Sequence, residues 1–98
     1  MKSLFKQLDK AFENKIRLGI MSALMVNSQV SFNDLKEILD LTDGNLASHL
    51  KYLEKENYIS VRKSFVNRKP NTVYTATQTG KTAFETHLNA LEEIIKQL

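Results

Sequence analysis

Cysteine and tryptophan are absent from the 98 residues, proline occurs once, and glycine occurs three times. Without cysteine the chain has no disulfide framework, no thiolate metal site and no cysteine nucleophile. No internal repeat or Gly/Ser-rich linker divides the chain, so a second domain is not indicated. With 42% hydrophobic and 26% charged residues, the composition is that of one small globular domain spanning residues 1–98.

A long hydrophobic run is also missing. The most apolar stretch, Leu18 to Val26, is far shorter than the roughly 20 residues that cross a bilayer. The N-terminal sequence MKSLFKQLDKAF has neither the apolar core nor the small-residue cleavage site of a signal peptide. We therefore expect a cytoplasmic protein that has no membrane partner.

Residues that would support catalysis or metal binding are scarce as well. His49 and His87 are far apart in the sequence and belong to no catalytic motif. The isolated glycines form no phosphate-binding loop. No second strong metal ligand stands three or four positions from His87, which we interpret as a solvated or interface histidine. The sequence thus predicts no enzyme, no cofactor and no metal site.

Apolar spacing predicts two helices and a short strand in the first third of the chain. Leucines and phenylalanines three or four residues apart predict a helix over about residues 1–13. A helix over about residues 15–25 is apolar on two sides, as expected of a buried central helix. Residues 29–32 are too few for more than one edge strand.

Two short helices follow, each with its own start signal. Ser31 stands three residues before Asp34, a spacing typical of a capping box. Thr42 can cap the next helix, which we expect to begin near Asp43. Its buried face is predicted from the four- and three-residue steps between Leu46, Leu50 and Leu53.

Past Glu56 the pattern predicts a β-hairpin and a last helix. Alternating apolar residues predict a half-exposed strand over residues 59–65, and β-branched residues predict a second strand over 72–76. Residues 66–71 are interpreted as the turn between them. Apolar residues in four- and three-residue steps predict a helix over about residues 79–98.

The positive charge is concentrated in one part of the chain. Residues 45–74 carry six cations against two acids, whereas the rest of the chain has a slight excess of acids. No acidic residue occurs between Glu56 and Glu85. A surface of this kind attracts phosphates and releases their counterions, although a solvated basic hairpin is the alternative.

The order of these elements predicts a winged helix-turn-helix. Two short helices joined by a tight connector form the helix-turn-helix, and the hairpin that follows is the wing. We therefore expect an α+β fold that is mostly helical, with a two- to three-stranded antiparallel wing. The second helix can enter a DNA major groove, and the wing can lie along the backbone or the adjacent minor groove.

Candidate DNA contacts follow from this placement. On the recognition helix they are the exposed polar and basic residues Asn45, Ser48, His49, Lys51, Tyr52 and Lys55. On the wing they are the cations Arg62, Lys63, Arg68 and Lys69. Structural roles remain open for several of them: Asn45 can support the helix start, Ser48 can be a small exposed residue, and His49 and Tyr52 can flank the core.

The run from Thr42 to Phe84 resembles winged-helix transcriptional regulators of the ArsR and MarR type. The recognition-helix pattern T-D-G-N-L-x-x-H-L-x-x-L-E and the later pattern T-x-x-G-K-x-A-F carry the resemblance, which extends back to Ile16-Arg17-Leu18-Gly19-Ile20-Met21. It implies a bacterial or archaeal, sequence-specific double-stranded DNA-binding homodimer. The cysteines or clustered His and carboxylate residues of the metal-sensing members are absent here, and no effector can be named.

Dimerisation is expected through the terminal helices, about residues 1–13 and 79–98. The apolar residues assigned to this interface are Leu4, Leu8, Phe12, Leu88, Leu91, Ile95 and Leu98. The alternative function is a winged-helix protein-interaction or assembly module that does not bind DNA. An RNA-binding role is less favoured, because Phe65 and Tyr74 are the only candidate stacking aromatics and are expected to turn into the core or sheet.

Overall fold

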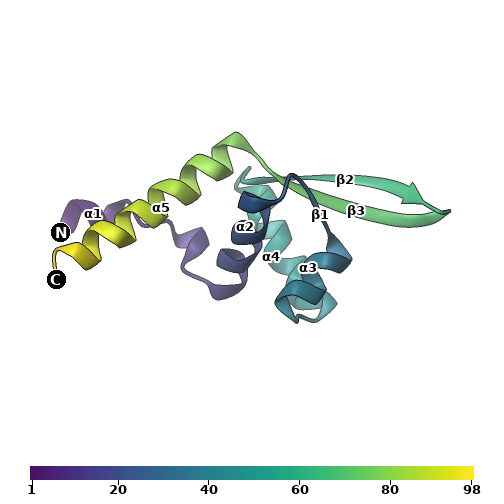
Figure 1. Cartoon of the computed structure of the whole chain (residues 1–98), viewed down its shortest axis with the longest axis horizontal. Coiled ribbons are helices and arrows are strands. Elements are labelled where there is room, and N and C mark those ends of the chain that lie inside the picture. Colours follow the sequence, from purple (N-terminus) through teal and green to yellow (C-terminus); the bar gives the residue numbers. More distant parts are fainter.

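The computed structural model describes residues 1–98 as an elongated molecule of 53 × 25 × 21 Å. Its elements are α1 (Lys2–Lys6), the 3-10 helix η1 (Lys10–Phe12), α2 (Lys15–Val26), β1 (Val30–Ser31), α3 (Phe32–Leu39), α4 (Asp43–Lys55), β2 (Ile59–Val66), β3 (Lys69–Ala76) and α5 (Gln78–Lys96). The β2–β3 hairpin projects from one end, and both chain termini lie at the other (Figure 1). None of the helices is both long and apolar enough to span a bilayer.

Side-chain caps fix where three of the helices begin. The hydroxyls of Ser31, Thr42 and Thr77 accept hydrogen bonds from backbone N–H groups three residues later, at the starts of α3, α4 and α5. Such caps satisfy donors that have no partner within the helix. α3 ends at Asp40, whose φ of 53° turns the chain sharply toward α4. The predicted helix-turn-helix is confirmed.

The sheet has three antiparallel strands in the order β1-β3-β2. The hairpin turn consists of Asn67 and Arg68 alone, because Val66 pairs with Lys69. Both turn residues have positive φ, 53° and 66°, as a two-residue type I′ turn requires. The expected six-residue turn is therefore wrong, and the wing is longer than expected.

The core lies where α2 meets the helix-turn-helix. Ile20, Met21 and Leu24 of α2 are buried, as are the three predicted leucines of α4 and Leu35 of α3. α2 packs against α3, α4, α5 and β3, which confirms its central position. The sequence predicts that Tyr74 and Phe65 both turn into the core or sheet. Tyr74 is buried, but Phe65 of β2 is 76% exposed, so its side chain does not turn inward as expected.

The N-terminal segment is not one continuous helix. α1 ends at Lys6, and Asp9 adopts an extended conformation in which its carboxylate accepts a hydrogen bond from the Ala11 N–H at the start of η1. This break lets Phe12 enter the core, where its ring contacts the rings of Tyr58, Phe84 and His87. The expected helix over about residues 1–13 is therefore wrong, because the chain leaves the helical conformation between Lys6 and Lys10.

His87 is buried rather than solvated. Only 3% of the residue is exposed, and its Nδ1 accepts a hydrogen bond of 2.9 Å from the Asp9 N–H. The Asp9 carboxylate in turn accepts a hydrogen bond from the Tyr58 hydroxyl. These contacts join the N-terminal segment to α5 and to the base of the wing.

Candidate functional site

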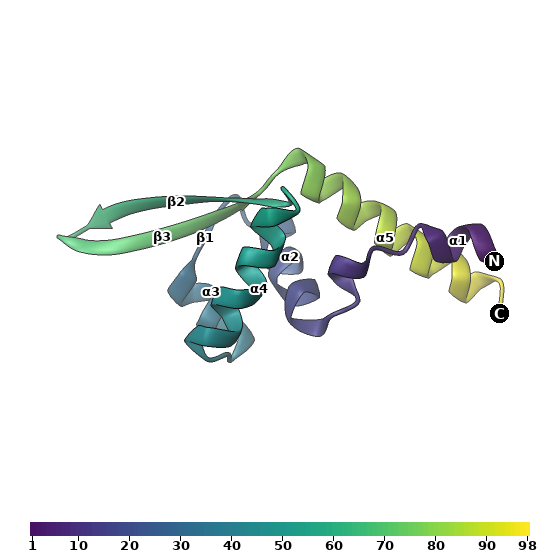
Figure 2. The ribbon, with the colours of Figure 1, turned by 180° about the vertical axis from the view of Figure 1, so that it is seen from behind.

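The outer surface of α4 carries the short polar and basic side chains predicted for recognition. Asn45, Ser48, Lys51 and Lys55 are exposed, because the leucines of α4 occupy the opposite face. Figure 2 shows α4 in front of α2, with the wing extending from above its C-terminal end. Ser48 donates a hydrogen bond to the Asn45 carbonyl oxygen, which holds its hydroxyl close to the helix.

The wing adds four exposed cations, Arg62, Lys63, Arg68 and Lys69. Arg62 donates a hydrogen bond to the Gln29 amide oxygen. The ion pairs of the chain involve Lys36 and Lys96 and none of the six cations on α4 and β2–β3. Their positive charge is therefore not neutralised within the protein.

His49 and Tyr52 differ from the other recognition-helix residues because both are half-buried against Arg17 of α2. The Arg17 NH1 nitrogen lies 3.1 Å from His49 Nδ1, and the guanidinium carbon lies 3.9 Å from the centre of the Tyr52 ring. Arg17 Nε and NH2 donate to the carbonyl oxygens of Ala11 and Lys10, at 2.7 and 3.4 Å. Arg17 thus ties α4 to η1.

The contact with Arg17 determines which nitrogen of the His49 ring carries the proton. A guanidinium has no acceptor, so Nδ1 must accept the hydrogen bond and Nε2 must carry the proton. Burial and the nearby Arg17 charge lower the pKa of His49 from its ordinary value of 6.5, so the ring is neutral at pH 7. Nε2 of His49 has no hydrogen-bond partner within the protein. Because every buried side-chain nitrogen and oxygen of the chain has a partner, Nε2 is not buried and reaches solvent.

Sequence reasoning did not assign a functional role to Arg17. A usable signal exists, since it is the only charged residue between Lys15 and Asp34, in an otherwise apolar helix. A half-buried cation in an apolar segment needs hydrogen-bond acceptors or an opposite charge close to it. The partner His49, however, is 32 residues away and cannot be found from local spacing.

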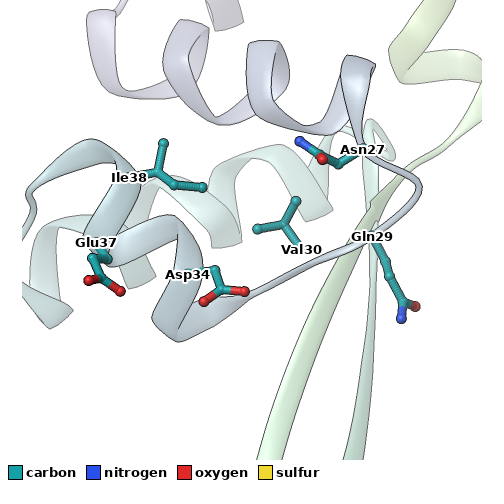
Figure 3. A pocket seen from close by; sticks show the side chains of 6 residues that line it. All are labelled: Asn27, Gln29, Val30, Asp34, Glu37 and Ile38. Atoms are coloured by element: carbon teal, nitrogen blue, oxygen red, sulfur yellow. The ribbon is translucent and has the colours of Figure 1, made fainter.

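A pocket of about 360 Å³ lies outside the basic surface, between the end of α2, β1 and α3 (Figure 3). Its lining residues are Asn27, Gln29, Val30, Asp34, Glu37 and Ile38. Figure 3 shows the Gln29 amide pointing away from Val30 and Ile38. Two carboxylates at this pocket disfavour phosphate, and no group of three or more His, Asp or Glu side chains is placed to hold a metal ion.

The residues assigned to the dimer interface fall into two groups. Leu88, Leu91, Ile95 and Leu98 are 41%, 38%, 70% and 94% exposed, and Leu4 and Leu8 are half-buried beside them. Phe12, by contrast, is buried in the core of its own chain. α1 lies alongside the C-terminal half of α5, as both views of the ribbon show (Figures 1 and 2).

Comparisons with known proteins agree with this geometry. A family model described as a winged helix DNA-binding domain matches residues 16–95. An uncharacterized protein of Methanocaldococcus jannaschii is 34% identical over 89 residues, which are 91% of this chain and 97% of that protein. The structure of a transcriptional regulator homologue protein from Pyrococcus horikoshii OT3 matches with a TM-score of 0.89 and 32% identity, covering 99% of this chain and 97% of that one. Wild-type MarR from E. coli shares the fold, with a TM-score of 0.68 and 14% identity over 99% of this chain and 78% of its own.

Proposed function

The chain belongs to the winged helix DNA-binding domain family, whose members are transcriptional regulators and not enzymes, and we propose that it acts as a sequence-specific homodimer on duplex DNA. In this proposal α4 enters the major groove, where its side chains contact base edges. The wing lies along the backbone or in the adjacent minor groove. The terminal helices α1 and α5 join the two protomers.

The observation that carries the proposal is the set of six exposed, unpaired cations on α4 and the wing. Binding phosphates releases condensed counterions, so cations without an acidic partner gain most from contact with DNA. The short polar residues Asn45 and Ser48 are exposed on α4, N-terminal to Lys51 and Lys55, where they can read base edges. Electrostatic attraction and base readout are thus available on adjoining surfaces.

The test is selection of bound fragments from a pool of random duplexes, with a protein-free pool as the control. We expect enrichment of a pseudo-palindrome whose half-sites lie about one helical turn, or roughly 34 Å, apart. Enrichment of a site without two-fold symmetry would contradict the homodimer. No enrichment over the control would favour a protein-interaction module instead.

A further inference from the structure

Arg17 differs from the cations of α4 and the wing because its guanidinium contacts several other residues of the protein. It donates to two backbone carbonyl oxygens and to His49 Nδ1, and it stacks over Tyr52. These bonds direct three of the five N–H donors of the guanidinium to partners within the protein. These contacts indicate that Arg17 holds neighbouring residues of the protein in place.

What Arg17 holds is the flank of α4 that contains His49 and Tyr52. His49 lies one helical turn after Asn45, on the side of the helix next to its exposed face. Arg17 occupies Nδ1, which leaves Nε2 as the only ring nitrogen directed to solvent and makes it a donor. An unrestrained neutral histidine would offer an acceptor at Nε2 for part of the time.

We propose that Arg17 is a positioning residue for DNA binding, fixing His49 as the Nε2–H tautomer so that this N–H donates to an acceptor atom on DNA. This inference rests on the proposed function. The acceptor is an oxygen or nitrogen of a base edge, or a phosphate oxygen; both sources share the same chemistry. The Tyr52 ring, whose centre lies 3.9 Å from the guanidinium carbon, helps to hold Arg17 beside His49.

The first test needs no DNA. Nitrogen-15 NMR of the free protein at pH 7.5 reports which ring nitrogen of each histidine carries the proton. We expect His49 to show an unprotonated Nδ1 and a protonated Nε2. Arg17→Met should mix the two tautomers, whereas the control Lys15→Met, which removes an exposed cation from the same helix, should leave the pattern unchanged.

The second test measures DNA affinity with substitutions that separate the ring from the donor. His49→Phe keeps a ring but removes the N–H, and we expect it to weaken binding about 3- to 10-fold, the usual effect of one hydrogen bond. His49→Gln, which restores an N–H at a similar reach, should recover most of this loss. A loss confined to the selected duplex identifies a base acceptor, and an equal loss on a scrambled duplex identifies a phosphate.

The third test asks whether Arg17 acts through His49. Arg17→Met should weaken binding about 3- to 10-fold in the wild-type background but less than about twofold in the His49→Phe background. Equal losses in both backgrounds would overturn the proposal, as would an Nδ1-protonated ring or unchanged binding by His49→Phe. If Arg17→Met fails to fold, the wild-type NMR pattern and the two His49 variants still decide. The outcomes above would overturn only the role of Arg17. A wild-type protein that binds no duplex would instead refute the proposed function itself.

Discussion

Gly80 lies where the first turn of α5 passes the residue that precedes β2. A Cβ atom at this position would overlap the carbonyl oxygen of Tyr58. That oxygen is held in place by a 3.0 Å hydrogen bond from the Thr77 N–H, so it cannot move aside without losing the bond. We expect Gly80→Ala to lower the free energy of unfolding by about 1–3 kcal/mol, the usual cost of overpacking.

Gly44 is the matched control for this prediction. It also lies in the first turn of a helix, but a Cβ atom there would meet nothing within 4 Å. Gly44→Ala should leave stability unchanged or raise it by up to about 1 kcal/mol, because alanine is the better helix former. Urea unfolding of both variants measures the difference, and equal stabilities would contradict the close approach at Gly80.

His49 makes stability depend on pH. Burial, and then the charge of Arg17, lower its pKa in the folded chain below 6.5, so the unfolded chain binds the proton at higher pH. The stability that this residue contributes is therefore complete above about pH 6.5 and is lost as the pH falls through the folded-state pKa. We expect the free energy of unfolding to fall more steeply between about pH 7 and 5 in wild type than in His49→Gln.

Urea unfolding at several pH values checks this expectation. All other residues are the same in both proteins, so the difference between the two curves reports on His49. Parallel curves would mean that His49 has the same pKa in the folded and unfolded chains. That result would also argue against the Arg17 contact.

The helices were predictable because their signals are local. Ser31, Thr42 and Thr77 each cap an N–H group three residues away, and the leucines of α4 mark its buried face by their spacing. The sequence mispredicts the hairpin turn, because a proline is typical of turns and Pro70 therefore predicts one. It lies in β3 opposite Phe65, where its missing N–H faces away from β2, since Val66 and Lys69 form the hydrogen-bonded pair next to the turn.

Only part of the candidate site can be predicted from the sequence. The exposed side of α4 follows from helical periodicity, and the cations of the wing follow from composition. The Arg17–His49–Tyr52 contact joins α2 to α4 and depends on tertiary packing. The break at Asp9, which sends Phe12 into the core, depends equally on a distant partner, the ring of His87.

α4 and the wing should contribute differently to DNA binding. Lys51→Ala should cost about 1–3 kcal/mol on the selected duplex if Lys51 makes a good base contact, and much less on a scrambled one. Replacing Arg68 and Lys69 together with alanine should weaken both complexes and reduce the slope of log affinity against log salt by about two units for each wing. Titrations of both duplexes at several salt concentrations distinguish the two effects.

Folding is the control for the wing variant. Arg68 and Lys69 are exposed, so their removal should change the free energy of unfolding by less than about 0.5 kcal/mol. Unchanged affinity with an unchanged salt slope would mean that the wing does not contact DNA. The protein-interaction function would then be favoured.

The molecule as a whole is elongated, with the wing at one end and an exposed apolar face at the other. On α5 this face contains Leu91 and Ile95, and a second copy is the partner we expect to cover it. Replacing both residues with lysine should give a folded monomer at concentrations on the order of tens of micromolar, where a stable dimer would persist. Val26→Lys, a similar change at an 82% exposed residue of α2 that is not among the residues assigned to the interface, should leave the dimer intact.

Dimerisation should raise the affinity for DNA, because a dimer can place its two copies of α4 on two half-sites at once. When both half-sites are engaged, the second binds at a high effective concentration, so the monomeric Leu91→Lys/Ile95→Lys variant should bind the full site about 10²- to 10⁴-fold more weakly. Its affinity for a single half-site should match that of wild type, because α4 and the wing are unaltered. Light scattering and titrations on full and half-sites measure both quantities. A variant that remains dimeric would place the interface elsewhere, and a monomer with full affinity would mean that one protomer reads the whole site.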